Sequence, residues 1–199
     1  MRYTRCDFMA AEIQRRLFTI NDCYKMVEVG ILRPEERVEL IHGEIVRMSP
    51  IGTRHSAVVD RANRAFVRLA GDNAIVRVQS TTVLDEFCAP EPDLALLRPR
   101  DDFYIHKHPA GRDILLIVEV ADSSLDYDTS VKAELYAILG VPEYWVVDLQ
   151  NNRVLAYSDA LKDRYRTVRE LHQGDSIAPQ LLPDCRLPMD VLLPSDSEK

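Results

Sequence analysis

Residues 113–128, "DILLIVEVADSSLDYD", constrain the fold more than any other stretch of the chain. The first half is aliphatic, and a single carboxylate, Glu119, lies inside the run. A strand that is apolar on both faces belongs at the centre of a sheet that is covered on each side. An acid withdrawn from water there is costly unless a cation, hydrogen bonds or a raised pKa compensates. Glu119 is therefore a candidate functional residue.

The composition fits one globular core. The chain has 199 residues, of which 46% are hydrophobic, so we expect a single domain over 1–199 with peripheral ends at 1–17 and 179–199. Its 25 basic residues are outnumbered by 32 acidic ones, which gives a net charge of -7. This balance argues against a protein that coats nucleic acid over a broad surface, because such binding needs Lys and Arg to neutralise phosphates. The negative net charge is still compatible with a local basic strip beside an acidic metal pocket.

The cysteines are scattered and form no CxxC pair, so a structural zinc site of the usual spacing is not expected. The N-terminus carries no secretory signal, and no apolar run approaches the roughly 20 residues that span a bilayer. We therefore expect a cytoplasmic protein with reduced thiols and no membrane partner. The four cysteines are Cys6, Cys23, Cys88 and Cys185.

The N-terminal third predicts a helix and a hairpin. In "TINDCYKMVEVG", Thr19 can cap a helix together with Asp22, and Gly30 can end it. "RVELIHGEIVRM" alternates polar and apolar residues on both sides of His42-Gly43, which is typical of a hairpin with a two-residue turn.

From His55 to Gly71 the hydrophobic period becomes helical. One face is expected to be buried, and the opposite face carries three arginines that could follow a nucleic-acid backbone, although a charged outer helix face is the usual explanation. The expected buried residues are Val58, Ala62, Phe66 and Leu69, and the arginines are Arg61, Arg64 and Arg68.

The remaining chain predicts strands around one more helix. "AIVRVQ", "PDLALL", "ILLIVEVA", "EYWVVDL" and "RVLAYS" are expected strands, and Pro-rich residues 179–199 are expected to wrap the surface. "DYDTSVKAELYAILG" is an expected helix that buries Val131, Leu135 and Ile138 and stops at Gly140. This order of elements indicates an α/β sandwich around a mixed sheet.

Two acids on this sheet could form a metal site. Asp93 opens a strand directly after Pro92, and Glu119 lies within another strand. Two carboxylates brought within a few ångström repel each other unless a cation or a proton lies between them. Mg²⁺ suits such a pair, since it takes one or two carboxylates and completes its shell with water and phosphate. Lys132, about one turn into the next helix, shares a stripe with Asp128 and Tyr136 and could steady developing negative charge.

Several blocks of the sequence resemble the Uma-two family of restriction-endonuclease-like proteins. They span about Thr19 to Tyr157 and keep the family's order and spacing. The resemblance implies the PD-(D/E)XK nuclease fold, a central mixed β-sheet flanked by α-helices, and a divalent-metal phosphodiesterase site. The blocks are "RVELIHGEIVRMSPIGTRHS", "EPDLALLRP", "LLIVEVADSSLDYD", the lysine at 132 and "GVPEYWVVDL".

The resemblance also implies roles for individual residues. The family's PD aspartate falls on Asp93 and its strand glutamate on Glu119, the two expected metal ligands, while its helix lysine falls on Lys132. The acid of its "GE" hairpin falls on Glu44, which is expected to complete the catalytic set. Two further matches are expected to bind substrate, namely His55 and Gln79.

One departure from the wider superfamily concerns the lysine. The pattern E-x-K would place it two residues after Glu119, where this chain has Ala121. The resemblance implies that Lys132 on the following helix takes its place. If Lys132 does not reach the carboxylates, a metal-binding or vestigial site becomes the better interpretation.

Three hypotheses follow. The first is an endonuclease that uses Mg²⁺, or Mn²⁺, to hydrolyse DNA with an activated water, and that forms a homodimer. The second is a non-catalytic protein that keeps the nuclease fold for nucleic-acid binding or assembly, which the overall acidity and the missing E-x-K lysine favour. The third is a glycosidase-like pair of acids, which the neighbouring lysine and the absence of an aromatic-lined sugar cleft disfavour.

Overall fold

The structure is a computed structural model that describes residues 15–33 and 35–193. Its centre is a six-stranded sheet in the order β3-β4-β5-β6-β7-β8. Neighbouring strands are antiparallel except for β5 and β6, which are parallel. The predicted mixed sheet is therefore confirmed. The strands are β3 Ile75–Val78, β4 Leu94–Leu97, β5 Ile114–Ala121, β6 Glu143–Asp148, β7 Arg153–Leu161 and β8 Arg164–Leu171.

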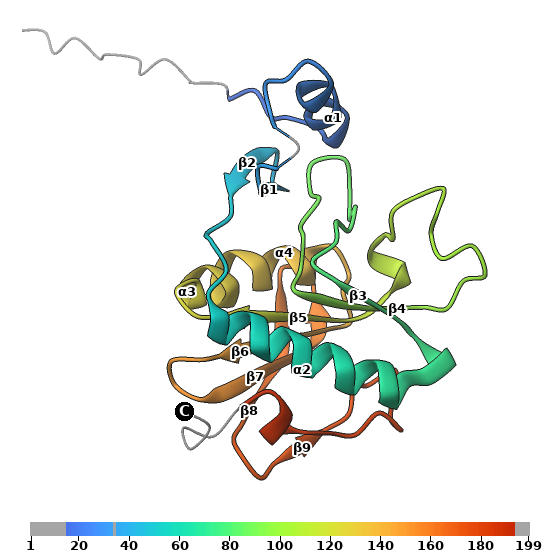
Figure 1. Cartoon of the computed structure of the whole chain (residues 1–199), viewed down its shortest axis with the longest axis vertical. Coiled ribbons are helices and arrows are strands. Elements are labelled where there is room, and N and C mark those ends of the chain that lie inside the picture. The colour runs from blue at the N-terminus through green and yellow to red at the C-terminus, as the bar shows by residue number, and fades with distance from the viewer. Residues whose placement is uncertain (1–14, 34, 194–199) are drawn as a thin grey trace, which may run out of the picture.

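Helices cover both faces of this sheet (Figure 1). Helix α2 (Thr53–Ala70) packs on one face, and the helical segment after β5 packs on the other. That segment makes the crossover between the two parallel strands and consists of α3 Leu125–Tyr127, η3 Asp128–Lys132 and α4 Ala133–Ile138. None of the helices in the described residues is both long and apolar enough to cross a membrane. Three single 3₁₀ turns complete the helices: η1 Gly71–Asn73, η2 Gly111–Asp113 and η4 Met189–Val191.

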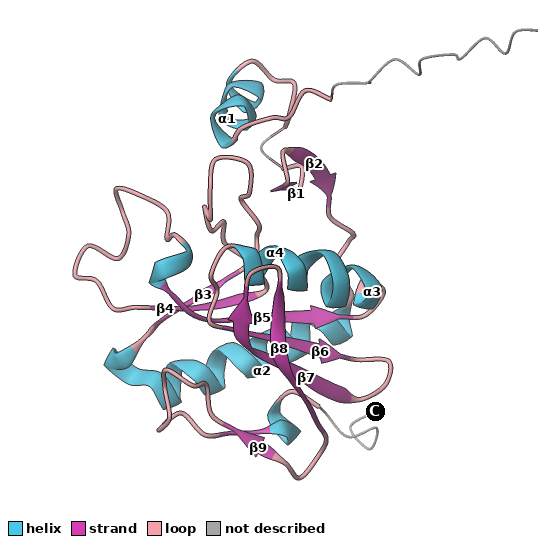
Figure 2. Ribbon diagram, turned by 180° about the vertical axis from the view of Figure 1, so that it is seen from behind, coloured by secondary structure: helices cyan, strands magenta, loops and turns pink. Residues whose placement is uncertain are grey.

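Helix α1 (Ile20–Glu28) and the hairpin of β1 (Val38–Ile41) and β2 (Glu44–Arg47) form as predicted. Thr19 and Asp22 make the reciprocal bonds of a capping box. His42 and Gly43 both adopt positive φ, 50° and 75°, as a two-residue type I′ turn requires. Figure 2 shows α1 and the hairpin on the side of the sheet that carries α4.

The buried face of α2 differs from the prediction at one position. Val58, Ala62 and Phe66 are fully buried, and Phe66 packs 6.0 Å from the ring centre of Trp145. Leu69, however, is 38% exposed, while Ala70 is buried. The buried positions continue at intervals of four residues, so the core contact at the end of the helix falls on Ala70.

A β-bulge changes which residues of β5 face each side. Leu96 pairs with Leu116 and Leu97 pairs with Ile114, so Leu115 is an extra residue on β5. Simple alternation would place Ile114 and Leu116 on the same face of the sheet. Instead, Leu115 and Leu116 both pack on the face that α2 covers, and Ile114 packs on the other face. An unpaired residue shifts the alternation on one side of it. Beyond the bulge the expected pattern holds.

The helix after β5 is not a regular α-helix. Asp128–Lys132 forms a π-turn, which inserts extra length and rotates the residues that follow. Leu135 is buried as predicted, but Ile138 is 48% exposed, and Tyr136 and Ala137 are buried instead. The rotation turns Lys132 and Tyr136 toward the sheet.

The C-terminal segment contributes to the core rather than only wrapping the surface. Leu187, Met189 and Leu192 are buried in the same cluster as α2, near the short pair β9 (Ser176–Ile177) and β10 (Leu187–Pro188). Residues 194–199, like the first fourteen, lie outside the described residues.

Candidate active site

The antiparallel pairing of β4 and β5 brings Asp93 and Glu119 together. Leu94, the first residue of β4, pairs with Val118 near the end of β5, so the residues beside them are neighbours. The backbone N–H of Asp93 donates to Glu119 Oε2 at 3.2 Å. Asp93 Oδ2 in turn accepts from the backbone N–H of Val120 at 2.9 Å. The predicted convergence of the two acids is thus present in the structure.

Lys132 reaches this pair from the π-turn. Its Nζ donates to Glu119 Oε1 at 2.8 Å and to Glu39 Oε1 at 3.1 Å. The hydroxyl of Tyr136 donates to the same Glu119 oxygen at 2.9 Å. The predicted shared stripe of Lys132 and Tyr136 is confirmed, and the lysine displaced from the E-x-K position does contact the strand acid.

Glu39, which sequence reasoning missed, is the hairpin acid at the site. It is 4% exposed, and besides Lys132 it accepts from the backbone N–H of Glu91 at 2.8 Å. Glu39 shares a hairpin face with Ile41, which is buried. Glu39 and Ile41 are two residues apart in a strand, so their side chains project from the same face. An acid on the same face as an apolar residue is the signal that could have indicated Glu39.

The structure does not bring Glu44 to the site. Its side chain is 60% exposed and pairs with Arg15 at 3.2 Å. In the hairpin register Glu39 pairs with Val46, and Glu44 pairs with Ile41 beside the turn. Glu44 therefore lies on the same face as Glu39 but about 7 Å further along the strands, toward the turn.

His55 and Gln79 both hold Asp93. His55, in the first turn of α2, places Nε2 2.9 Å from Asp93 Oδ2. Gln79, which has a positive φ of 44° after β3, donates from Nε2 to Asp93 Oδ1 at 3.2 Å. Both residues therefore contact the Asp93 carboxylate. Of the two, only His55 lines the pocket described below.

Asp128 is a further buried acid at the site. It is 3% exposed and accepts from Ser124 Oγ at 2.6 Å. Burial raises its pKa, against the opposing effects of Lys132 and Ser124. Its place on the stripe with Lys132 was predicted from the sequence.

The cluster carries more negative charge than its ammonium can balance. Burial raises the pKa of Glu119 to about 8, and Lys132 opposes this only in part. Repulsion from the other buried acids adds to the rise. Burial disfavours the ammonium of Lys132, but the surrounding carboxylates outweigh burial and raise its pKa, so Lys132 stays protonated. A proton on Glu119 or a bound cation would relieve the excess charge. The other acids are Asp93, Asp128 and Glu39.

Asp93 behaves in the opposite way. Its burial would raise its pKa, but bonds from His55, the Val120 N–H and Gln79 outweigh burial and hold the pKa below its usual value. Asp93 is thus an ionised carboxylate beside a glutamate that retains its proton more strongly. Neighbouring acids with divergent pKa values are typical of functional sites.

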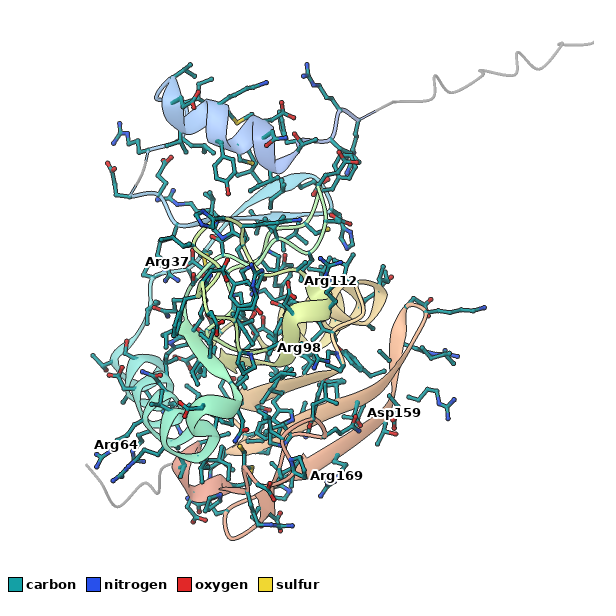
Figure 3. The ribbon with its side chains drawn as sticks, turned by 90° about the vertical axis from the view of Figure 1, so that its right-hand side faces the viewer. Arg37, Arg64, Arg98, Arg112, Asp159 and Arg169 are labelled. Atoms are coloured by element: carbon teal, nitrogen blue, oxygen red, sulfur yellow. The ribbon has the colours of Figure 1, made fainter. Side chains whose placement is uncertain are left out.

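These groups line one pocket of about 350 Å³. Its floor comes from the start of β4, the end of β5 and the π-turn, and one wall comes from the hairpin and residues 48–52. The three arginines predicted on the outer face of α2 are not among its lining residues. Figure 3 shows Arg64 on α2 and Arg37 beside the hairpin, at separate places on the molecule.

The two acids have the oxygen donors that Mg²⁺ takes. Within residues 15–33 and 35–193, no group of three or more His, Cys, Asp or Glu side chains is placed to hold a metal ion. Mg²⁺ needs only one or two carboxylates, since water and phosphate complete its shell. Asp93 Oδ1 and Glu119 Oε2 each accept one hydrogen bond. Each oxygen keeps a further lone pair for a cation.

A comparison with solved structures found the same fold in another protein. One match, described as a "putative nuclease belonging to DUF820" from Anabaena variabilis, has a TM-score of 0.67 and 15% identity, and the alignment covers 88% of this chain and 97% of that one. The family model described as Uma2, "Putative restriction endonuclease", matches residues 22–190. The chain therefore belongs to the Uma2 (Uma-two) family. A search of curated proteins found no match.

Proposed function

We propose that this protein is a magnesium-dependent nuclease that hydrolyses phosphodiester bonds, with DNA as its substrate and Mn²⁺ as an alternative metal. The observation that carries the proposal is the meeting of Asp93, Glu119 and Lys132 in one pocket, where Glu119 accepts hydrogen bonds from the Asp93 backbone N–H at 3.2 Å and from Lys132 Nζ at 2.8 Å. Membership of a family described as restriction endonucleases supports it.

Asp93 and Glu119 would hold the metal, which supplies a Lewis acid that polarises the phosphate and lowers the pKa of a bound water. In the hydrolysis the water oxygen bonds to phosphorus and the ester P–O bond breaks, leaving a phosphate monoester and a hydroxyl. Lys132 stays an ammonium in a buried setting, where it stabilises negative charge on the phosphate. His55 and Gln79 fix the orientation of Asp93.

The direct test is metal-dependent cleavage by acid-to-amide variants. Asp93→Asn and Glu119→Gln should each lower the cleavage rate at least about 100-fold while the fold is kept, because each removes a metal-ligand charge. Matched controls are Asp159→Asn, at an exposed position of β7, and Glu134→Gln, at an exposed position of α4, which should cleave like the wild type. Cleavage that persists in both site variants, or that resists EDTA, contradicts the proposal.

A second candidate is a nuclease-fold protein without catalysis, acting in nucleic-acid binding or assembly. The observation that favours it is that Lys132, with a side chain 6% exposed, already donates to two acids, as in a purely structural ion cluster. This candidate predicts no cleavage of any nucleic acid with any divalent metal, together with retained nucleic-acid binding.

We further propose a homodimer in the cytoplasm. Strands β3 and β8 are the two edges of the central sheet, and edges of this kind can pair with a second copy. Light scattering coupled to size exclusion tests the dimer, and a monomer at working concentration rejects it. Cell fractionation tests the location.

A further inference from the structure

We infer that the site acts on an unpaired strand of nucleic acid and not on continuous duplex. This inference rests on the proposed nuclease function and names the substrate class of the same site. It comes from four features of the pocket: the burial of the reacting groups, the fixed hairpin wall, the small volume, and the charge of the lining.

The groups assigned to chemistry lie deep in the protein. The side chains of Asp93, Glu119 and Lys132 are 9%, 5% and 6% exposed. A metal ion held by the two acids would lie about 2 Å from each ligand oxygen, and the phosphate would have to bind that same ion. The phosphate must therefore enter the pocket, where the backbone of a paired helix cannot follow with both strands.

One wall of the pocket is the hairpin, which is firmly attached to the rest of the protein. Leu40 exchanges two backbone hydrogen bonds with Ala89, and the Gly43 N–H donates to Phe87 at 2.8 Å. Leu40 is also 3% exposed and packed into the protein. Glu39 adds its direct bond to Lys132. Lifting the hairpin would break all of these contacts together, so the wall is a fixed part of the site.

The pocket is small. Its lining includes residues 49–52, which lead into α2, and residues 122–124, which follow β5. A Cβ placed on Gly52 would be 3.9 Å from Asp122 Oδ2, so these two segments lie close together there. The pocket volume of about 350 Å³ is near the lower end of the roughly 300–1,000 Å³ typical of small-molecule sites. That space suits one segment of a flexible single strand.

The lining also lacks the cations to neutralise the many phosphates of a bound duplex. Its carboxylates outnumber its permanent cations, and the cation Arg37 is itself paired with Glu91 at 3.3 Å. Duplex binders typically neutralise about 6–10 phosphates with Lys and Arg. An acidic pocket instead suits a single phosphate accompanied by divalent metal. The lining carboxylates are Glu39, Asp93, Glu119, Asp122 and Asp128, and the permanent cations are Arg37, Arg47 and Lys132.

The test compares two covalently closed circular DNAs of one sequence, one fully paired and one with a short unpaired bubble. A labelled linear single strand and its RNA counterpart complete the set, with Mg²⁺ or Mn²⁺ present. Wild type and Asp159→Asn should cut the single strand, and the bubble circle at its bubble, at least about 10-fold faster than the paired circle. Glu119→Gln should cut none, which assigns the cleavage to this pocket.

The outcomes distinguish a failure of this inference from a failure of the proposed nuclease function. Cutting of the paired circle at the single-strand rate overturns the inference and leaves the nuclease assignment standing. Absence of metal-dependent cleavage on every substrate overturns the nuclease assignment and the inference with it. As a second measurement, unlabelled single strand should slow cleavage of the labelled strand, whereas an equal amount of paired circle should not. Equal competition by the paired circle contradicts the inference.

Discussion

Glu39 and Lys132 share a hydrogen bond of 3.1 Å although 93 residues separate them in the chain. One belongs to the hairpin and the other to the π-turn, so this bond joins the wall of the pocket to its floor. Lys132 also bonds Glu119 at 2.8 Å, and two acids from different elements therefore fix one ammonium. A charge held in this way is already in position for a substrate and needs no rearrangement.

Replacing Lys132 should destabilise the fold strongly. Lys132→Met leaves buried Glu119 and Glu39 without their cation, and breaking a buried ion pair from one side typically costs about 3–5 kcal/mol. The loss of unfolding free energy, measured by urea denaturation, should be smaller at pH 5 than at pH 8, because Glu119 can take up a proton at the lower pH. A loss below about 1 kcal/mol at pH 8 would show that the cluster is open to water.

The two hairpin acids should respond differently to alanine. Glu39→Ala removes the acceptor of Lys132 and of the Glu91 N–H, which should lower the unfolding free energy by about 1–3 kcal/mol and also reduce cleavage. Glu44→Ala, at a side chain 60% exposed, should stay within about 0.5 kcal/mol of the wild type. If Glu44→Ala abolished cleavage and Glu39→Ala did not, the assignment of Glu39 to the site would fail.

The sequence alone indicated several of the contacts at this site. Glu119 was conspicuous because an acid inside an aliphatic run needs a partner, and Lys132 and Tyr136 were placed on one stripe by helical spacing. Both of these now bond the same Glu119 oxygen. Such signals are local, so a sequence carries them directly. The pairing of Asp93 with Glu119 followed from strand order and from the family resemblance.

The features that were missed depend on contacts distant in the chain. Glu39 is buried only because the hairpin packs against residues 87–91, and an acid in a four-residue strand otherwise resembles a solvated one. The bulge at Leu115 and the π-turn at Asp128–Lys132 each shift the side-chain period by one residue. A hydrophobic pattern read over many residues does not resolve such a shift. The π-turn precedes α4, in which Ile138 is exposed and Tyr136 and Ala137 are buried.

The stability of the metal-free protein should fall as pH rises across the range in which Glu119 titrates. Its pKa is raised from 4.5 to about 8, so between these values the folded state binds more protons than the unfolded state. Unfolding free energy then decreases with pH in that window. Thermal melts in EDTA from pH 5 to 9 should show the wild type losing stability relative to Glu119→Gln. Parallel curves for the two proteins would contradict the raised pKa.

Metal binding should release a proton. A divalent ion held by Asp93 and Glu119 requires both as carboxylates, and Glu119, with a pKa of about 8, is largely protonated at pH 7. Titration calorimetry with Mn²⁺ at pH 7 should therefore give a heat that varies with the ionisation enthalpy of the buffer, and an affinity that rises from pH 6 to pH 8.

Asp93→Asn should bind at least about 10-fold more weakly, because it removes one of the two charges that hold the ion. Glu134→Gln is the matched control on the exposed side of α4 and should behave like the wild type. Tight binding with no buffer dependence would place the ion away from Glu119.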